Sequence, residues 1–229
     1  MVSFPINRLQ FAIYNCGLSA LGRVKMISLH IVFYMMIIFF ALIGYLRGWQ
    51  REVIALTGLV ASIAFLSTFG QEVINLWPST DITEGMSPEA AIQANQARFW
   101  IQAIVHSSIA FFSYQMVTRL ADQVSGGRIG DRVRANLEKR VVGSLIGATN
   151  GYLFVGALWS FLEYMITPNG YQQLSPGALY AFDPLIIRPV EGTSMIIASR
   201  FLPMTASINP TWWLVLFFIA FFVVIVALI

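Results

Sequence analysis

Residues 26–70 read MISLHIVFYMMIIFFALIGYLRGWQREVIALTGLVASIAFLSTFG. This segment holds two apolar runs, residues 26–46 and 53–70, separated only by RGWQRE at residues 47–52. Neither run contains Asp, Glu, Lys or Arg, and as helices both are about 27 Å long or more, close to the thickness of a bilayer core. The short connection predicts that the two runs form an antiparallel helical hairpin in a membrane.

Three further runs, residues 99–118, 141–162 and 212–229, also lack charged side chains. Inside lipid the backbone must satisfy its own hydrogen bonds, which restricts a spanning chain to helices or a closed barrel. The runs lack the polar and apolar alternation of barrel strands. We therefore expect an all-α integral membrane protein with about five transmembrane helices.

The composition supports this fold class. Of the 229 residues, 57% are hydrophobic and 11% are charged, and the mean hydropathy is +0.71. Soluble chains carry about 25% charged residues, so an ordinary soluble enzyme, a disordered chain and a nucleic-acid-binding module are excluded. Cys16 is the single cysteine, which excludes an intramolecular disulfide and a thiolate metal cluster.

The distribution of basic residues predicts an orientation. The connections at residues 47–52 and 119–140 hold eight of the fourteen Lys and Arg residues. Cytoplasmic loops carry the excess of basic residues, so we expect these connections inside, the N-terminus outside and the C-terminus in the cytoplasm. Arg8, Arg23 and Lys25 would then lie outside, and the inverted topology remains the alternative.

The sequence divides into four predicted parts. Residues 1–25 form an N-terminal interfacial segment, because Arg8, Asn15, Ser19 and Arg23 share one helical face; a partly ordered tail is the alternative. Residues 26–165 form a four-helix membrane core, residues 166–211 an external loop with short interfacial helices, and residues 212–229 an additional C-terminal transmembrane helix.

Two helix starts are predicted outside the runs. Ser87 followed by Pro88 is typical of a helix N-terminus, and this helix should continue through residues 90–97 into the third run. Asp183-Pro184 could begin a short helix in the external loop. Turn residues surround it, as at Pro168-Asn169-Gly170.

Three glycines in the fourth run, Gly143, Gly147 and Gly151, are spaced four residues apart. Such glycines lie on one helical face and allow another helix backbone to approach closely, which favours helix packing in membranes. The partner helix could belong to this chain or to a second copy.

The connection at residues 47–52 contains Arg47, Gly48, Arg51 and Glu52. Arg47 and Arg51 can reach lipid phosphates, so we interpret this turn as a cytoplasmic membrane anchor. Docking of a partner protein is the alternative. Residues 128–140 add a basic amphipathic helix expected on the anionic leaflet. The glycine-containing stretch SGGRIG at residues 125–130 lacks the spacing of a nucleotide-binding loop.

His30 and His106 are the side chains in the runs that could ligate haem iron or a chlorophyll-type pigment. We expect hydrogen-bonded polar residues instead, because His30 lies near the interface and Ser107 and Ser108 flank His106. HExxH and GxSxG motifs are absent. The sequence therefore predicts a protein without catalytic residues, metal or cofactor.

Two stretches carry a family resemblance. IGYLRGWQREVIALTGL at residues 43–59 resembles the opening hairpin of the colicin V production protein family, an R-G-aromatic-x-R-E turn between two apolar helices. RVVGSLIGATNG at residues 140–151 is similar to the glycine-rich last helix of that family. Order and spacing agree over about residues 26–165.

This chain departs from the family pattern at several positions. Family members usually carry an acidic residue near the start of the first helix, where this chain has His30, and an Arg where it has Asn150. Residues 1–25 and 212–229 have no counterpart in the usual four-helix pattern.

The resemblance implies a bacterial inner-membrane protein that is linked genetically to toxin production or export and to envelope homeostasis. We expect a non-enzymatic scaffold or accessory subunit of a membrane assembly. Its partners would be membrane lipids and other membrane-protein subunits or a second copy, and not nucleic acid. The alternative is a small transporter or channel linked to the export of a toxin or solute.

Overall fold

The computed structural model describes residues 29–80, 86–117, 137–167, 170–174, 180–182, 185–186, 202–205 and 209–228. Most of these residues lie in long helices, which are α2 (Leu29–Arg47), α3 (Trp49–Asn75), α4 (Pro88–Phe112), α7 (Leu137–Glu163) and α9 (Pro210–Leu228). Shorter elements are the 3₁₀-helix η1 (Pro78–Thr80), the π-helix η2 (Ser113–Val117) that continues α4, and the strands β1 (Tyr164–Thr167) and β2 (Gly170–Gln173).

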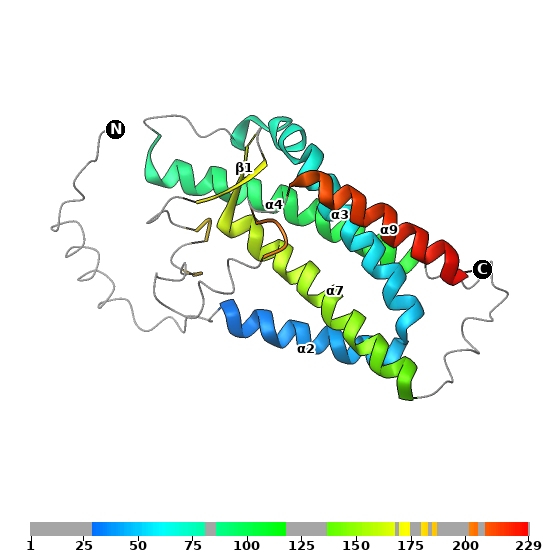
Figure 1. The fold of residues 1–229 in the computed structure, drawn as a ribbon. Coiled ribbons are helices and arrows are strands. Elements are labelled where there is room, and N and C mark those ends of the chain that lie inside the picture. The colour runs from blue at the N-terminus through cyan, green and yellow to red at the C-terminus, as the bar shows by residue number, and fades with distance from the viewer. Residues whose placement is uncertain are drawn as a thin grey trace.

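Helix α3 lies at the centre of the bundle (Figure 1). It packs against α4, α7 and α9, while α2 packs chiefly against the far side of α7. The core between α3 and α7 contains Leu59, Ile63 and Ala157, each fully buried. The added C-terminal helix thus packs on the core of its own chain, a point that the sequence left open.

Three described helices, α2, α3 and α7, are long and apolar enough to cross a membrane. Helix α9 is also apolar, but it is not among these three. Helix α4 does not qualify, because its first half carries polar residues such as Glu89, Asn95 and Arg98. The predicted count of five spans is therefore not confirmed.

The joint between α2 and α3 is a single residue, Gly48, with a φ of 82°. This left-handed backbone conformation favours glycine, because a Cβ atom would be strained there. The predicted hairpin of the first two runs needs correction. Its two helices meet only near Gly48 and then diverge, because α7 packs against α2 on one side and α3 on the other (Figure 1).

The prediction of an all-α fold is wrong in one detail. Strands β1 and β2 form an antiparallel hairpin directly after α7, with Tyr164 opposite Gln173 and Ile166 opposite Tyr171. The sequence indicated only the turn between them. Tyr164 and Ile166 are buried on one face of β1, and such aromatic and β-branched side chains favour strands over helices.

The predicted start of α4 is confirmed. Ser87 is the N-cap, its side chain accepts a hydrogen bond from the Ala90 amide at 3.3 Å, and Pro88 occupies the first helical position. The helix then continues without a break to Phe112. Three predictions lie outside the described residues: the interfacial segment at residues 1–25, most of the basic helix at residues 128–140, and the helix start at Asp183-Pro184.

Candidate functional site

Four glycines bring the backbones of α2 and α7 together, and we call them the glycine seam: Gly44, Gly143, Gly147 and Gly151. A Cβ atom on Gly147 would overlap the carbonyl oxygen of Phe40 and lie 2.9 Å from Gly44 Cα. A Cβ atom on Gly143 would overlap the carbonyl oxygen of Gly44. The three predicted packing glycines thus face a helix of their own chain.

The turn that follows α2 rests on the same seam. A Cβ atom on Gly143 would lie 3.0 Å from Trp49 N and 3.1 Å from Gly48 C. The end of α2, the Gly48 turn and the first turn of α3 are therefore held against α7 by backbone contact. A packing role for Gly44 was not predicted, although Gly44 lies four residues before Gly48 and so repeats the spacing seen in α7.

Beneath this turn lies a buried polar group that we call the Glu52 cluster: Arg47, Glu52, Tyr114 and Asn150. Arg47 Nη1 donates to Glu52 Oε1 at 3.2 Å, and the Tyr114 hydroxyl donates to Glu52 Oε2 at 3.1 Å. Asn150 Nδ2 donates to Glu52 Oε2 at 2.8 Å and to the Glu52 carbonyl oxygen at 3.0 Å. The carboxylate thereby joins α2, η2 and α7 to α3.

The charges of this cluster compensate one another. Glu52 is fully buried, and a buried carboxylate is stable only with a nearby positive charge and several hydrogen-bond donors. The Arg47 guanidinium supplies the charge and also lies 4.7 Å from the centre of the Tyr114 ring. Arg47 thus makes an internal contact that the sequence did not indicate, and membrane anchoring by this turn stays a prediction.

A polar stripe runs along the inner face of α4 and η2. Arg98, Gln102 and His106 are four residues apart, and Tyr114 follows after eight more, so all four share one helical face. Arg98 Nε donates to the Thr80 carbonyl oxygen at 2.8 Å. This spacing is visible in the sequence, but it belongs to no catalytic motif and its role was not predicted.

Two members of the stripe bond to other elements of the bundle. The Tyr171 hydroxyl of β2 donates to Gln102 Oε1 at 2.7 Å, and both side chains are buried. His106 Nδ1 is hydrogen-bonded to Ser62 Oγ of α3 at 2.7 Å. Hydrogen bonds across helices are one of the few forces that hold helices together in lipid.

His106 is fully buried, and its ring stacks on Phe154 at 5.3 Å between centres, with the edge of Phe161 at 5.9 Å. Its hydrogen-bond partner is Ser62 of α3, and not Ser107 or Ser108 as the sequence suggested. His30 is the second residue of α2 and is half-buried. The residues that the structure describes contain no group of three metal-binding side chains.

A second buried carboxylate, Glu163, is the last residue of α7, at the end of this helix away from the Glu52 cluster. The Tyr180 hydroxyl donates to Glu163 Oε2 at 2.6 Å, and Gln173 Nε2 donates to Oε1 at 2.8 Å. The Leu174 amide donates to the Glu163 carbonyl oxygen at 3.0 Å. Burial, together with the Glu163 charge, raises the pKa of Tyr164 to about 12. These contacts fix the β1–β2 hairpin to α7.

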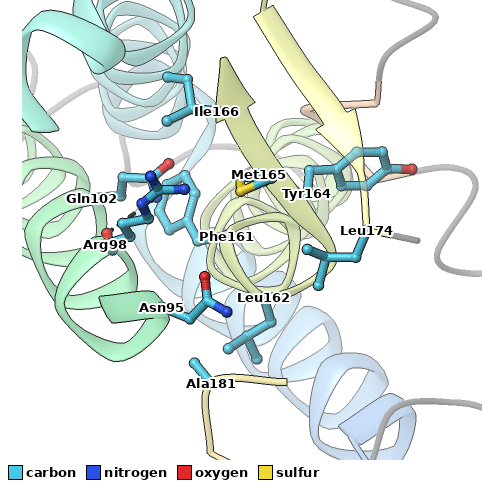
Figure 2. Close-up of a pocket in the computed structure, with 10 residues that line it drawn as sticks. All are labelled: Asn95, Arg98, Gln102, Phe161, Leu162, Tyr164, Met165, Ile166, Leu174 and Ala181. Carbon is cyan, nitrogen blue, oxygen red and sulfur yellow. Dashed lines mark hydrogen bonds between the residues drawn. The ribbon is translucent and has the colours of Figure 1, made fainter. Parts of the chain in front are cut away.

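A small pocket opens between α4 and the β1–β2 hairpin (Figure 2). Asn95, Arg98 and Gln102 line it from α4, and Met165 and Ile166 face them from β1. Its volume is about 20 Å³, which is room for about one water molecule. This pocket is too small for an organic substrate, and two of its polar residues, Arg98 and Gln102, form internal hydrogen bonds.

Residues 29–210 match the family model described as Colicin V production protein. The chain belongs to this family. The match covers 182 of the 229 residues and extends beyond the 26–165 range of the sequence resemblance, through the β1–β2 hairpin to the first residue of α9. No curated protein and no solved structure matches the chain.

Membership in the colicin V production family, together with three helices of spanning length, identifies a membrane protein of a family involved in toxin production. The glycine seam, the Glu52 cluster and the polar stripe all lie within the matched residues. Helix α9 lies past the matched residues except for Pro210.

Proposed function

We propose that this family member is a non-enzymatic scaffold or accessory subunit of a membrane assembly that serves toxin production. It would be a multi-pass protein of the bacterial inner membrane that takes no cofactor and binds no nucleic acid. Its proposed partners are membrane lipids and other membrane-protein subunits or a second copy. The proposal rests on how the chain uses its polar groups and its apolar surface.

The observation that carries the proposal is that several buried polar side chains of the bundle interior form hydrogen bonds to one another between different elements. Glu52, His106 and Gln102 each contact a side chain of another element, at distances of 2.7–3.1 Å. These side chains hold helices together. The large outer surface is apolar instead.

The apolar surface is largest on the two outer helices, α2 and α9. Helix α2 exposes bulky side chains along most of its length, namely Ile31, Val32, Tyr34, Met35, Ile38, Phe39, Leu42 and Leu46. Helix α9 exposes a similar set: Trp212, Val215, Leu216, Phe218, Ile219, Phe221, Phe222, Val223 and Ile225. In a membrane such faces contact acyl chains or the helices of partner proteins.

Purification from membranes in a mild detergent tests this function. We expect a defined oligomer or a complex with other membrane proteins, measured by size-exclusion chromatography with light scattering and by mass spectrometry of the bands that co-purify. A stable lone monomer would contradict the scaffold. A visible absorption band in the purified sample would contradict the absence of a pigment or haem.

The proposed orientation places the Gly48 turn and the start of α7 in the cytoplasm, with the N-terminus outside and the C-terminus inside. Arg51, Lys139 and Arg140 at this end support it, because basic residues are retained on the cytoplasmic side. Labelling of single cysteines, each introduced into a Cys16→Ser background, by a membrane-impermeant maleimide in whole cells tests it. Ser87→Cys should be labelled and Gln50→Cys should not, and the reverse pattern would establish the inverted topology.

A small transporter or channel is the second candidate. The observation that favours it is the buried polar stripe of α4, because ionisable side chains within membrane helices often mark ion and proton paths. Flux of ions or protons into liposomes that contain this protein alone would establish transport. The flux should then fall in Glu52→Gln or His106→Leu, and the absence of any flux would dismiss this candidate.

A further inference from the structure

The start of α7 carries two exposed basic side chains, Lys139 and Arg140, beside the end of α2. The Arg140 guanidinium lies over the ring of Tyr45, with 5.7 Å between its central carbon and the ring centre. Tyr45 is half-buried near the end of α2. A cation held over an aromatic face is restrained in position while its N–H groups can still bind an anion.

The other basic residue at the end of α2 is already engaged. Arg47 donates to Glu52 and stacks on Tyr114, so its charge is balanced inside the bundle. Lys139 and Arg140 form no hydrogen bond or ion pair with any residue that the structure describes. The positive charge at this end of the α2–α7 pair is therefore directed outward by Lys139 and Arg140.

An apolar surface begins directly beside the two basic residues. The neighbouring side chains on α2 and α7 are large, hydrophobic and exposed: Leu46 is 76% exposed, Leu137 71%, Leu145 65%, Val141 48% and Val142 45%. In a membrane this surface contacts acyl chains, which places Lys139 and Arg140 at the level of the headgroups. A soluble acidic protein or a free anion has no acyl chains to contact this apolar surface, whereas a phospholipid has.

We propose that Tyr45, Lys139 and Arg140 form a binding site for the phosphate of an anionic phospholipid headgroup. The guanidinium binds the phosphate through two N–H groups, and the ammonium group adds a second charge. Because Tyr45 lies on α2 and both basic residues lie on α7, the bound lipid bridges the two helices beside the glycine seam. The lipid therefore stabilises the packing of α2 on α7.

The experiment compares the full chain in nanodiscs of phosphatidylcholine alone and in nanodiscs with phosphatidylglycerol added. We expect phosphatidylglycerol to raise the thermal midpoint of unfolding, and native mass spectrometry to show retained phosphatidylglycerol molecules. In Lys139→Gln/Arg140→Gln the apparent affinity should fall about 30-fold. Each basic side chain near an anionic surface contributes about 1 kcal/mol, and about 1.4 kcal/mol is a factor of ten.

Three control variants separate the site from general charge effects. Arg188→Gln/Arg200→Gln removes the same charge from the external connection and should leave the lipid-dependent shift unchanged. Tyr45→Leu should weaken the shift, whereas Tyr45→Phe, which keeps the ring, should retain it.

Two results would overturn the proposal. One is an equal shift in the wild type and in Lys139→Gln/Arg140→Gln. The other is a shift reproduced by soluble glycerol phosphate in nanodiscs that lack phosphatidylglycerol, because a free anion would then suffice. Since Lys139 and Arg140 are exposed, Lys139→Gln/Arg140→Gln is expected to fold. The circular dichroism of every variant in phosphatidylcholine checks its fold before lipid is added.

Discussion

Helix α7 is held on its two sides by different kinds of contact. Toward α2 it presents the glycine seam, where the two helix backbones approach each other closely. Toward α3 and η2 it presents Asn150, whose amide bonds to Glu52 and lies within 3.4 Å of the Tyr114 hydroxyl. Apolar side chains gain little by leaving lipid, so helices associate through close packing or through polar contacts, and this chain uses one on each side.

The two contacts differ in what they specify. The glycine seam requires small residues at a fixed spacing. It has no room for larger side chains, and it includes no polar side chain that would recognise a particular partner residue. The Glu52 cluster requires a carboxylate, a cation and two further donors in one place, and it leaves a buried charge when one member is lost. Substitutions should therefore separate the two contacts by the size and by the nature of their effects.

The largest effect is expected at the polar side. Glu52→Ala removes the carboxylate and leaves Arg47 without its counter-charge, which should lower the free energy of unfolding by about 3 kcal/mol. Urea titration of the purified protein in detergent micelles, followed by circular dichroism, measures the change. Glu52→Gln keeps a hydrogen-bond acceptor and should cost less. A cost for Glu52→Ala below about 0.5 kcal/mol would show that the cluster contributes no net stability.

The glycine seam should be the next most sensitive. Gly147→Ala places a methyl group against the Phe40 carbonyl oxygen and near Gly44 Cα, and neither backbone can yield without moving a helix. Overpacking of this kind costs about 1–3 kcal/mol. The same titration measures it, with Thr149→Ala on the exposed face of α7 as the matched control. Equal stability of the two variants would mean that the backbones do not approach as described.

A smaller effect is expected where the polar stripe reaches the hairpin. Tyr171→Phe removes the donor to Gln102 Oε1, and a buried acceptor left without a partner costs about 1 kcal/mol. The ring is retained, so packing should be unchanged. Hydrogen exchange should rise in β1 and β2 and not in α2. Faster exchange in α2 as well would show that the two sides of α7 are coupled.

Alkaline pH should destabilise the end of the molecule that contains the β1–β2 hairpin, without any substitution. The pKa of Tyr164 is about 12 in the folded state against a usual 10.0, because burial and the Glu163 charge disfavour the phenolate. Folding therefore retains the proton that the unfolded chain loses. The contribution of Tyr164 to stability should be constant below about pH 10 and fall between about pH 10 and 12. Absorbance titration of tyrosinate in the wild type and in Tyr164→Phe measures the shift. Loss of structure below pH 10 would contradict it.

Parts of the fold and of the site could be predicted from the sequence. Uncharged runs located α2, α3 and α7, and Ser87-Pro88 located the start of α4, because these signals are local. The spacing of Gly143, Gly147 and Gly151 predicted that one face of α7 packs closely against another helix, but not which helix that is. Burial of Glu52 was not predicted, since Tyr114 and Asn150 lie far along the chain and nothing in the turn itself indicates them. The hairpin was missed because four-residue strands carry little periodicity.

By itself, the amino-acid sequence determined that the chain forms long apolar helices of a membrane protein and that one helix bears a glycine face. Only the tertiary structure decided that α2 covers this face, that α9 packs on α3, and that Glu52 is enclosed and not exposed at the turn. The physical reason is that lipid and protein interior are almost equally apolar. Hydrophobicity therefore reveals which segments enter the membrane but not which face of a helix meets lipid and which meets another helix.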